Sequence, residues 1–187
     1  MFSIGDQVVY PMHGAGIITA IEEREVLGEK QKYYIMALPI GDMKVMIPIN
    51  SAEEVGLRKV IDKQGAEKVI EVLNGDETKM SSNWNHRYRA NMEKIKSGDV
   101  FAVAEVVRNL SIRDRDKGLS TGERKMLDTA RQILISELVI VTESTEEEVN
   151  ELLEKCIENK GLDDLDEDFP DEYEEDEDNL DEDLQDE

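Results

Sequence analysis

The sequence predicts an α+β protein in which a small antiparallel β-barrel is followed by a compact bundle of five helices and a disordered acidic tail. Three observations lead to this prediction. Up to about Asn50, hydrophobic residues occur in short segments rich in Val, Ile and Tyr, as in strands. After Asn50 they recur with the period of an α-helix. Residues 161–187 carry 17 of the 45 Asp and Glu residues and no Lys or Arg.

The N-terminal segment contains four predicted strands, at residues 7–11, 14–26, 32–40 and 43–49. Glycines and prolines separate them, as expected for short strands joined by tight connections. Leu27-Gly28-Glu29 and Gly41-Asp42 are predicted hairpin turns, because glycine readily adopts the positive φ that such turns require. Short strands with tight turns indicate a small antiparallel barrel.

The next segment predicts five helices. The first three are expected at residues 62–73, 84–97 and 99–118, between Asn, Asp and Gly residues that start or end helices. Two capping boxes, Ser120 to Glu123 and Thr145 to Glu148, open the fourth and fifth helices. In each box the hydroxyl and the carboxylate satisfy free backbone N–H groups at the helix start.

Each of the last three helices carries one hydrophobic face. The third presents Val100, Val103, Ala104, Val107 and Leu110; the fourth presents Leu127, Ala130, Leu134, Leu138 and Val141; the fifth presents Val149, Leu152, Leu153, Cys156 and Ile157. Helices of this kind predict a compact bundle. We therefore expect domains at residues 1–55, 56–160 and 161–187.

The charge of the chain is unevenly distributed. Its 187 residues have a net charge of −23, from 22 Lys and Arg against 45 Asp and Glu. That average argues against binding to nucleic acid or to an anionic membrane. Residues 58–137, however, contain 16 basic and 13 acidic residues, so this block could meet DNA. For the acidic tail two roles stay open, competition with DNA for the basic block and a purely solubilising extension.

The single Cys156 cannot form an intramolecular disulfide, and residues 1–14 lack the basic and apolar regions of a signal peptide. Both observations favour a reducing, cytoplasmic compartment. No apolar run approaches the roughly 18 residues that span a bilayer. We therefore expect no membrane partner.

The set of catalytic and metal-binding side chains is small. The two histidines, His13 and His86, fall in different predicted domains, and Cys156 lies on a hydrophobic helix face. No zinc-ligand spacing, phosphate-binding glycine loop or nucleophile elbow occurs. We expect a protein that is not an enzyme and that uses no metal and no cofactor.

The segment from Asn83 to Arg89 is the strongest candidate site. It contains the only tryptophan, Trp84, next to three residues that can carry positive charge: His86, Arg87 and Arg89. Helix starts attract anions, and an aromatic ring beside cations suits a nucleic-acid backbone. The alternative is that Trp84 belongs to the core, because it stands at helical spacing from Tyr88, Met92 and Ile95.

Two further candidate surfaces carry basic residues. A short link through Gly118 and Leu119 joins the third and fourth helices and gathers four cations into a candidate phosphate-contacting patch: Arg115, Lys117, Arg124 and Lys125. In the barrel, Arg24 lies among three glutamates and is a candidate for a protein interface. The alternative for Arg24 is a surface charge without a role.

Several motifs occur together in both halves of the chain. The first half contains Gly5 to Pro11, His13-Gly14 and Met43 to Pro48. The second half contains Asn83-Trp84, Arg87-Tyr88, Ala90-Asn91, Lys96 to Asp99, Ala104 to Arg108, Gly118 to Ser120 and Gly122 to Leu127. In combination they resemble the CarD family. The first set resembles the family's RNA-polymerase-interacting domain, which is shared with transcription-repair coupling factor. The second set resembles the family's helical DNA-binding domain. The similarity covers about residues 2–160.

The resemblance implies a function without catalysis. The Tudor-like (SH3-like) barrel of CarD proteins docks on the β subunit of bacterial RNA polymerase, and the helical domain contacts promoter DNA at the upstream edge of the transcription bubble. Trp84 matches the family's tryptophan, which wedges into the minor groove. Arg87 and Arg89 match basic positions expected to contact the DNA backbone, and His86 is adjacent.

For the barrel, Arg24 matches a polymerase-contacting arginine. A second such arginine in some members falls at Met46, so Lys44 or Met46 itself is expected to face the polymerase. The leading prediction is a monomeric regulator that stabilises the open promoter complex through DNA contacts that are not sequence-specific. The alternative is a Tudor-like protein–protein adaptor without direct DNA contact, which predicts a buried Trp84.

Overall fold

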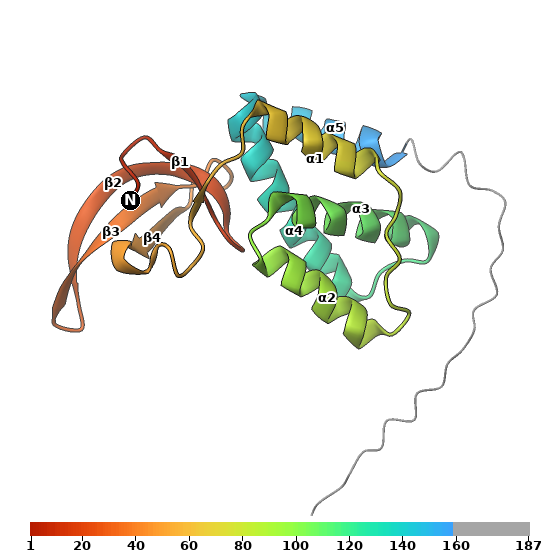
Figure 1. Ribbon diagram of the computed structural model, residues 1–187, viewed down its shortest axis with the longest axis horizontal. Helices are drawn as coiled ribbons and strands as arrows, with labels where there is room; N and C mark the ends of the chain where they lie inside the picture. Colours follow the sequence, from red (N-terminus) through yellow and green to blue (C-terminus); the bar gives the residue numbers. More distant parts are fainter. Residues whose placement is uncertain (159–187) are drawn as a thin grey trace, which may run out of the picture.

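The first part of the chain forms a curled five-stranded antiparallel sheet (Figure 1). The computed structural model describes residues 1–158, so the predicted disordered tail, residues 161–187, lies outside the described residues. In chain order, the strands are β1 (Gln7–Tyr10), β2 (Gly14–Val26), β3 (Glu29–Ala37), β4 (Lys44–Pro48) and β5 (Arg58–Lys59), and a 3-10 turn (Ile49–Ser51) follows β4. Across the sheet, the order of neighbouring strands is β4-β3-β2-β1-β5. The predicted antiparallel β domain is confirmed, whereas the two-residue strand β5 was missed.

Alternation along the strands separates a core face of the sheet from an outer face. Strand pairing places Ile18 opposite Met36 and Tyr34 opposite Ile47. All four side chains are buried and form the centre of the sheet's own hydrophobic core. Successive residues on a strand point to opposite sides of the sheet. The residues that alternate with these core residues along each strand therefore lie on the outer face.

Both predicted hairpin turns are confirmed. Leu27 and Gly28 join β2 to β3 with φ of 53° and 84°. Gly41 and Asp42 lie in the connection from β3 to β4, with φ of 81° and 50°. Two successive residues with positive φ match the twist of the flanking strands, and a glycine adopts this conformation at no steric cost.

The second part of the chain is a bundle of five helices, as predicted. They are α1 (Lys63–Asn74), α2 (Trp84–Lys96), α3 (Val100–Asp116), α4 (Thr121–Thr142) and α5 (Glu146–Glu158). The side chains of Asp62, Asn83 and Asp99 accept hydrogen bonds from the first backbone N–H groups of α1, α2 and α3. Both predicted capping boxes are present, at Ser120 with Glu123 and at Thr145 with Glu148.

The bundle core contains the predicted hydrophobic faces of α3 and α4 and most of that of α5. Cys156 is buried there as a small core residue. Leu152 is the exception, with 38% of its surface exposed. Val149, Leu153 and Cys156 form a single stripe on α5, and Leu152 lies at its edge because α5 packs on one side only. Within residues 1–158, no helix combines the length and hydrophobicity needed to cross a membrane.

The sheet packs directly against α4. The backbone N–H of Ala15 donates a 2.8 Å hydrogen bond to Oγ of Ser136, and both residues are buried. Gly14 has a φ of 100°, and a Cβ at this position would lie 2.6 Å from Ser136 Oγ. Only glycine permits this close approach of β2 to α4.

A buried glutamate on α4 joins the two parts of the protein. The Glu137 carboxylate has no exposed surface and accepts two hydrogen bonds from the Arg58 guanidinium, at 2.7 and 2.8 Å. It also accepts the backbone N–H of Ile61 at 2.9 Å. Nε of Arg58 donates to the carbonyl of Gly98 at the α2–α3 corner. One ion pair therefore links β5, the segment before α1, the α2–α3 corner and α4.

Replacing Glu137 with alanine should lower the free energy of unfolding by about 3 kcal/mol, since removing one partner of a buried ion pair leaves the other groups unsatisfied. We expect the lower part of the usual range because Arg58 is 30% exposed and can reach water. Urea unfolding measures the effect. As a control, Glu67→Ala on the exposed side of α1 should change stability by less than about 0.5 kcal/mol. Equal effects of the two substitutions would contradict the role given to Glu137.

Candidate functional site

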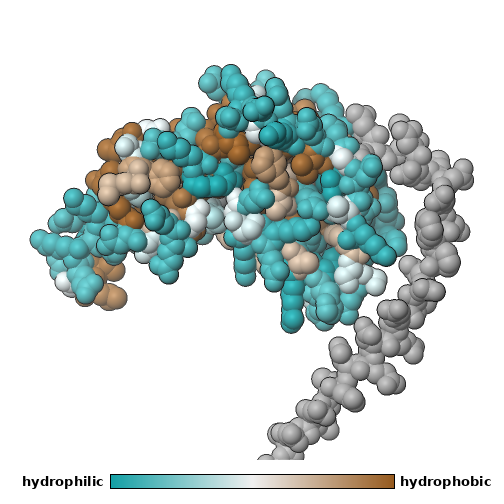
Figure 2. Space-filling view, in the orientation of Figure 1, coloured by the Kyte–Doolittle hydropathy of each residue, from teal (hydrophilic) through white to brown (hydrophobic). Residues whose placement is uncertain are grey.

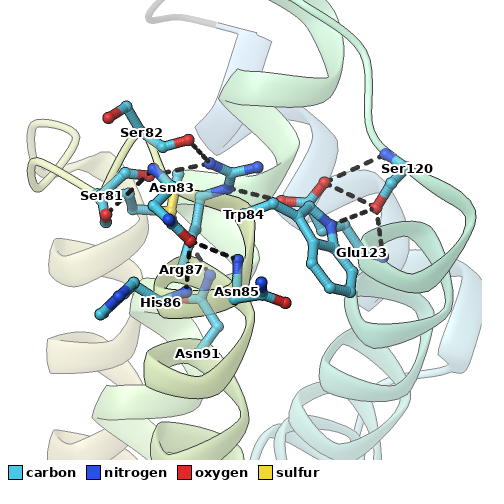
Figure 3. Close-up of polar contacts among 11 residues, drawn as sticks. Ser81, Ser82, Asn83, Trp84, Asn85, His86, Arg87, Asn91, Ser120 and Glu123 are labelled. Atoms are coloured by element: carbon cyan, nitrogen blue, oxygen red, sulfur yellow. Dashed lines mark hydrogen bonds and ion pairs between the residues drawn. The ribbon is translucent and has the colours of Figure 1, made fainter. Parts of the chain in front are cut away.

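Trp84 is the first residue of α2 and lies beside the start of α4 (Figure 3). Its indole Nε1 donates a 2.9 Å hydrogen bond to Oγ of Ser120, the N-cap of α4. Its rings stack on Tyr88, with centroids 5.1 Å apart and planes inclined by 26°. Trp84 nevertheless has 43% of its surface exposed to solvent. The interpretation of Trp84 as a core residue is therefore wrong, although Ile95 on the same helix is buried.

Two helix N-termini meet at Trp84. Asn83 caps α2 through the N–H groups of Asn85 and His86, and Ser120 caps α4 through that of Glu123. The amino end of each helix carries a partial positive charge, so their proximity favours a negatively charged ligand. Four predicted DNA-contacting residues lie exposed within the first two turns of these helices: His86 and Arg89 on α2, and Arg124 and Lys125 on α4.

Arg87 does not belong to this exposed set. Its side chain is 4% exposed and pairs at 2.6 Å with the equally buried carboxylate of Glu123. It also donates to the backbone carbonyls of Ser81 and Ser82. Because its side chain is buried in this way, Arg87 is not placed to contact a phosphate. We therefore correct the sequence-based assignment of Arg87 as a DNA contact: its role here is structural.

The predicted patch at the α3–α4 link is only partly assembled. Lys117 is exposed at the C-cap of α3, and Arg124 lies 3.4 Å from the carboxylate of Asp114. Arg115 contacts α5 instead, where it donates to the carbonyl of Ile157 at 3.3 Å. Arg124 and Lys125 therefore share the start of α4 with Ser120, the hydrogen-bond partner of Trp84, whereas Arg115 is bonded to α5.

Next to the Trp84–Tyr88 stack lies a hollow of about 200 Å³ that was not predicted from the sequence. Its lining is mainly apolar and combines α2, α4 and the loop between β1 and β2: Met12, Tyr88, Met92, Ile95, Gly122, Lys125, Met126 and Thr129. Its shape depends on the packing of the sheet against the bundle, so no local sequence pattern could have indicated it.

Strand pairing places the three predicted polymerase-contacting residues on one face of the sheet. Residues opposite each other on antiparallel strands point to the same side, and residues two apart on one strand share a face. The pairs are Arg24 with Gln31, Met46 with Ile35 and Lys44 with Ala37. Arg24, Lys44 and Met46 thus share the outer face, and all three are exposed. In the space-filling view, hydrophobic surface lies over both the sheet and the adjoining part of the bundle (Figure 2).

Among residues 1–158, no three His, Cys, Asp or Glu side chains lie close enough together to hold a metal ion. The perturbed carboxylate at the site, Glu123, is explained by its structural partners. Burial alone would raise its pKa, but hydrogen bonds from Arg87 and Ser120, together with the charge of Arg87, outweigh burial and lower the pKa.

The lowered pKa of Glu123 predicts a pH dependence of stability. The pKa of a glutamate in the unfolded chain is about 4.5. A folded-state pKa below this value stabilises the protein fully above pH 4.5, and the stabilisation is lost as the pH falls through the folded-state pKa. The difference in free energy of unfolding between the natural protein and Glu123→Gln should therefore be largest near pH 7 and narrow below about pH 4.5. Urea unfolding across this range is the measurement, and a constant difference would contradict the prediction.

Comparison with known proteins gives matches over both parts of the chain. The family model described as the CarD-like/TRCF RID domain matches residues 2–61, and the model described as the CarD C-terminal domain matches residues 68–154. YdeB of Bacillus subtilis (strain 168), whose name describes it as a candidate transcription factor, is 44% identical over 149 residues, which cover 80% of this chain and 97% of YdeB.

Two solved structures from Myxococcus xanthus also match. The N-terminal domain of CarD is 34% identical, covering 32% of this chain and 79% of that one, with a TM-score of 0.29. CdnLNt is 39% identical, covering 34% of this chain and 89% of that one, with a TM-score of 0.29. The two family models and the extended identity to YdeB establish the relationship. This chain belongs to the CarD family of transcription factors.

Proposed function

We propose that this protein binds the β subunit of RNA polymerase through the outer face of its sheet and stabilises the open promoter complex by contacting DNA at the upstream edge of the bubble. It acts as a monomer and catalyses no reaction. The observation that carries the DNA contact is the half-exposed indole of Trp84, held at the junction of two helix N-termini. An aromatic ring in this position can wedge between partly unstacked base pairs from the minor groove.

The charges around Trp84 support a contact with DNA that does not depend on base sequence. Arg89, Arg124 and Lys125 are exposed within the first two turns of α2 and α4, where they can neutralise backbone phosphates. Phosphate contacts position a protein on DNA without reading its sequence. His86 on α2 and Lys117 at the C-cap of α3 are exposed as well.

The polymerase contact is supported by the match of residues 2–61 to the CarD-like/TRCF RID model. Arg24 provides an exposed charge on the outer face, and the half-exposed Met46 provides apolar area. Docking of this face would hold Trp84 near the promoter at high effective concentration, so even weak DNA contacts would become significant. A protein that binds the open form of the promoter more tightly than the closed form shifts the equilibrium toward open.

The adaptor alternative has less support. A protein that recruits a partner without touching DNA needs no exposed tryptophan, and this alternative predicted that Trp84 is buried. The 43% exposure of Trp84 contradicts that expectation.

Replacing Trp84 with alanine should leave the protein folded and bound to polymerase but shorten the lifetime of the open complex about fivefold or more, because stacking of one base on an aromatic ring contributes roughly 1–3 kcal/mol. The lifetime can be followed by competitor challenge of polymerase on a promoter. Leu152→Ala removes a comparably exposed hydrophobic residue from α5 and should have no effect. A Trp84→Ala protein with the full natural lifetime would disprove the proposed DNA contact.

Replacing Arg24 with alanine should weaken binding to the isolated polymerase β lobe about five- to tenfold, as expected when a side chain at an interface centre is removed. The matched control is Lys32→Ala, which removes the same charge from the opposite face of the same hairpin. Binding can be measured by calorimetry. Equal affinities of the two variants would exclude the outer face as the docking surface.

A further inference from the structure

The hydroxyl of Ser120 has one proton and three polar neighbours. Its Oγ lies 2.9 Å from Nε1 of Trp84, 3.2 Å from the backbone N of Glu123 and 2.9 Å from Oε2 of Glu123. The indole and the backbone amide can only donate, whereas an ionised carboxylate can only accept. The proton of Ser120 must therefore point to Glu123, and the lone pairs of Oγ are left to receive the N–H groups of Glu123 and Trp84.

The carboxylate that sets this direction is itself held in place. Oε1 of Glu123 accepts Nε of Arg87 at 2.6 Å, and both side chains are more than nine-tenths buried. Nη1 of Arg87 donates to the carbonyls of Ser81 and Ser82, just before α2 begins. A continuous chain of hydrogen bonds therefore runs from the backbone before α2 through Arg87, Glu123 and Ser120 to the indole of Trp84 (Figure 3).

We infer that Arg87 and Glu123 are positioning residues which, through Ser120, fix the direction of the Trp84 indole for its contact with DNA. The inference rests on the proposed function and explains why an arginine that cannot reach DNA lies one turn from the DNA-contacting ring. An exposed indole that had to be ordered on binding would lose rotamer freedom at that moment, and ordering it in the free protein removes this cost. The stack on Tyr88 restrains the ring plane, and Ser120 restrains rotation of the ring within it.

The test compares three substitutions at helix N-caps. Ser120→Ala removes the acceptor of the indole, whereas Ser120→Thr keeps a hydroxyl that can restore it. Thr145→Ala removes the hydroxyl of the second capping box, which has the same geometry but lies at the start of α5. It controls for the loss of helix capping. Because Trp84 is the only tryptophan, its indole N–H resonance and its fluorescence report on this side chain alone.

In Ser120→Ala the indole N–H resonance should move toward that of a water-exposed indole, and the open-complex lifetime should fall about three- to tenfold, the effect of losing one hydrogen bond. Ser120→Thr and Thr145→Ala should keep the natural signal and lifetime. An unchanged indole signal in Ser120→Ala would overturn the inference. The inference would also be overturned if Ser120→Ala changed the indole signal but not the open-complex lifetime, provided that Trp84→Ala does shorten that lifetime. If Trp84→Ala has no effect, the proposed function fails, while the indole signal still decides whether Ser120 holds Trp84.

The contribution of the ion pair is tested by the double substitution Arg87→Met with Glu123→Gln. It removes both charges together, so no unpaired buried charge remains, and glutamine still completes a capping box. The protein should remain folded by circular dichroism, with the indole resonance shifted in the same direction as in Ser120→Ala. A folded double variant with the natural indole signal would show that Ser120 alone orients Trp84 and would overturn the role given to Arg87 and Glu123.

Discussion

The relative placement of the two functional surfaces, the outer face of the sheet and the Trp84 site, depends on the bonds of the buried Glu137 carboxylate. It binds Arg58 of β5 and the backbone of Ile61, while the preceding residue, Ser136, receives the N–H of Ala15 in β2. A buried carboxylate requires such partners, because leaving it without them would cost several kcal/mol. The sheet is thereby held against α4 by contacts from β2, β5 and the segment before α1.

Helix α4 connects the contact with the sheet at Glu137 to the Trp84 site near Glu123. Glu123 lies in its first turn and Glu137 fourteen residues later, about 21 Å along the axis at 1.5 Å per residue. Both glutamates are buried and paired with arginines from other elements. One end of α4 therefore fixes the sheet, and the other end holds the Trp84 indole. If the sheet docks on polymerase, the rigid connection determines where the indole meets DNA, which a flexible linker could not do.

Much of the fold could be predicted from the sequence because its signals are local. Helix starts depend on side chains within three residues, hairpin turns on a glycine, and hydrophobic faces on regular spacing, and these predictions were confirmed. The contacts that build the site join distant residues: Trp84 with Ser120, Arg87 with Glu123 and Arg58 with Glu137. The Ser120 capping box was recognisable, but its second role as the indole acceptor was not. Arg87 was assigned to DNA because it lies at a helix start beside Trp84 and matches a basic position of the family. Neither signal reveals its buried partner on α4, Glu123.

The net charge of −23 is an average over parts with different properties, since residues 58–137 hold most of the basic residues.

The proposed function requires that Trp84 meets DNA when the sheet is docked on polymerase. The most direct test replaces Trp84 with a photo-crosslinking amino acid and maps its crosslinks in an open promoter complex. We expect crosslinks to promoter DNA at the upstream edge of the bubble, and only when polymerase is present. Crosslinks to polymerase alone, or to DNA elsewhere, would contradict it.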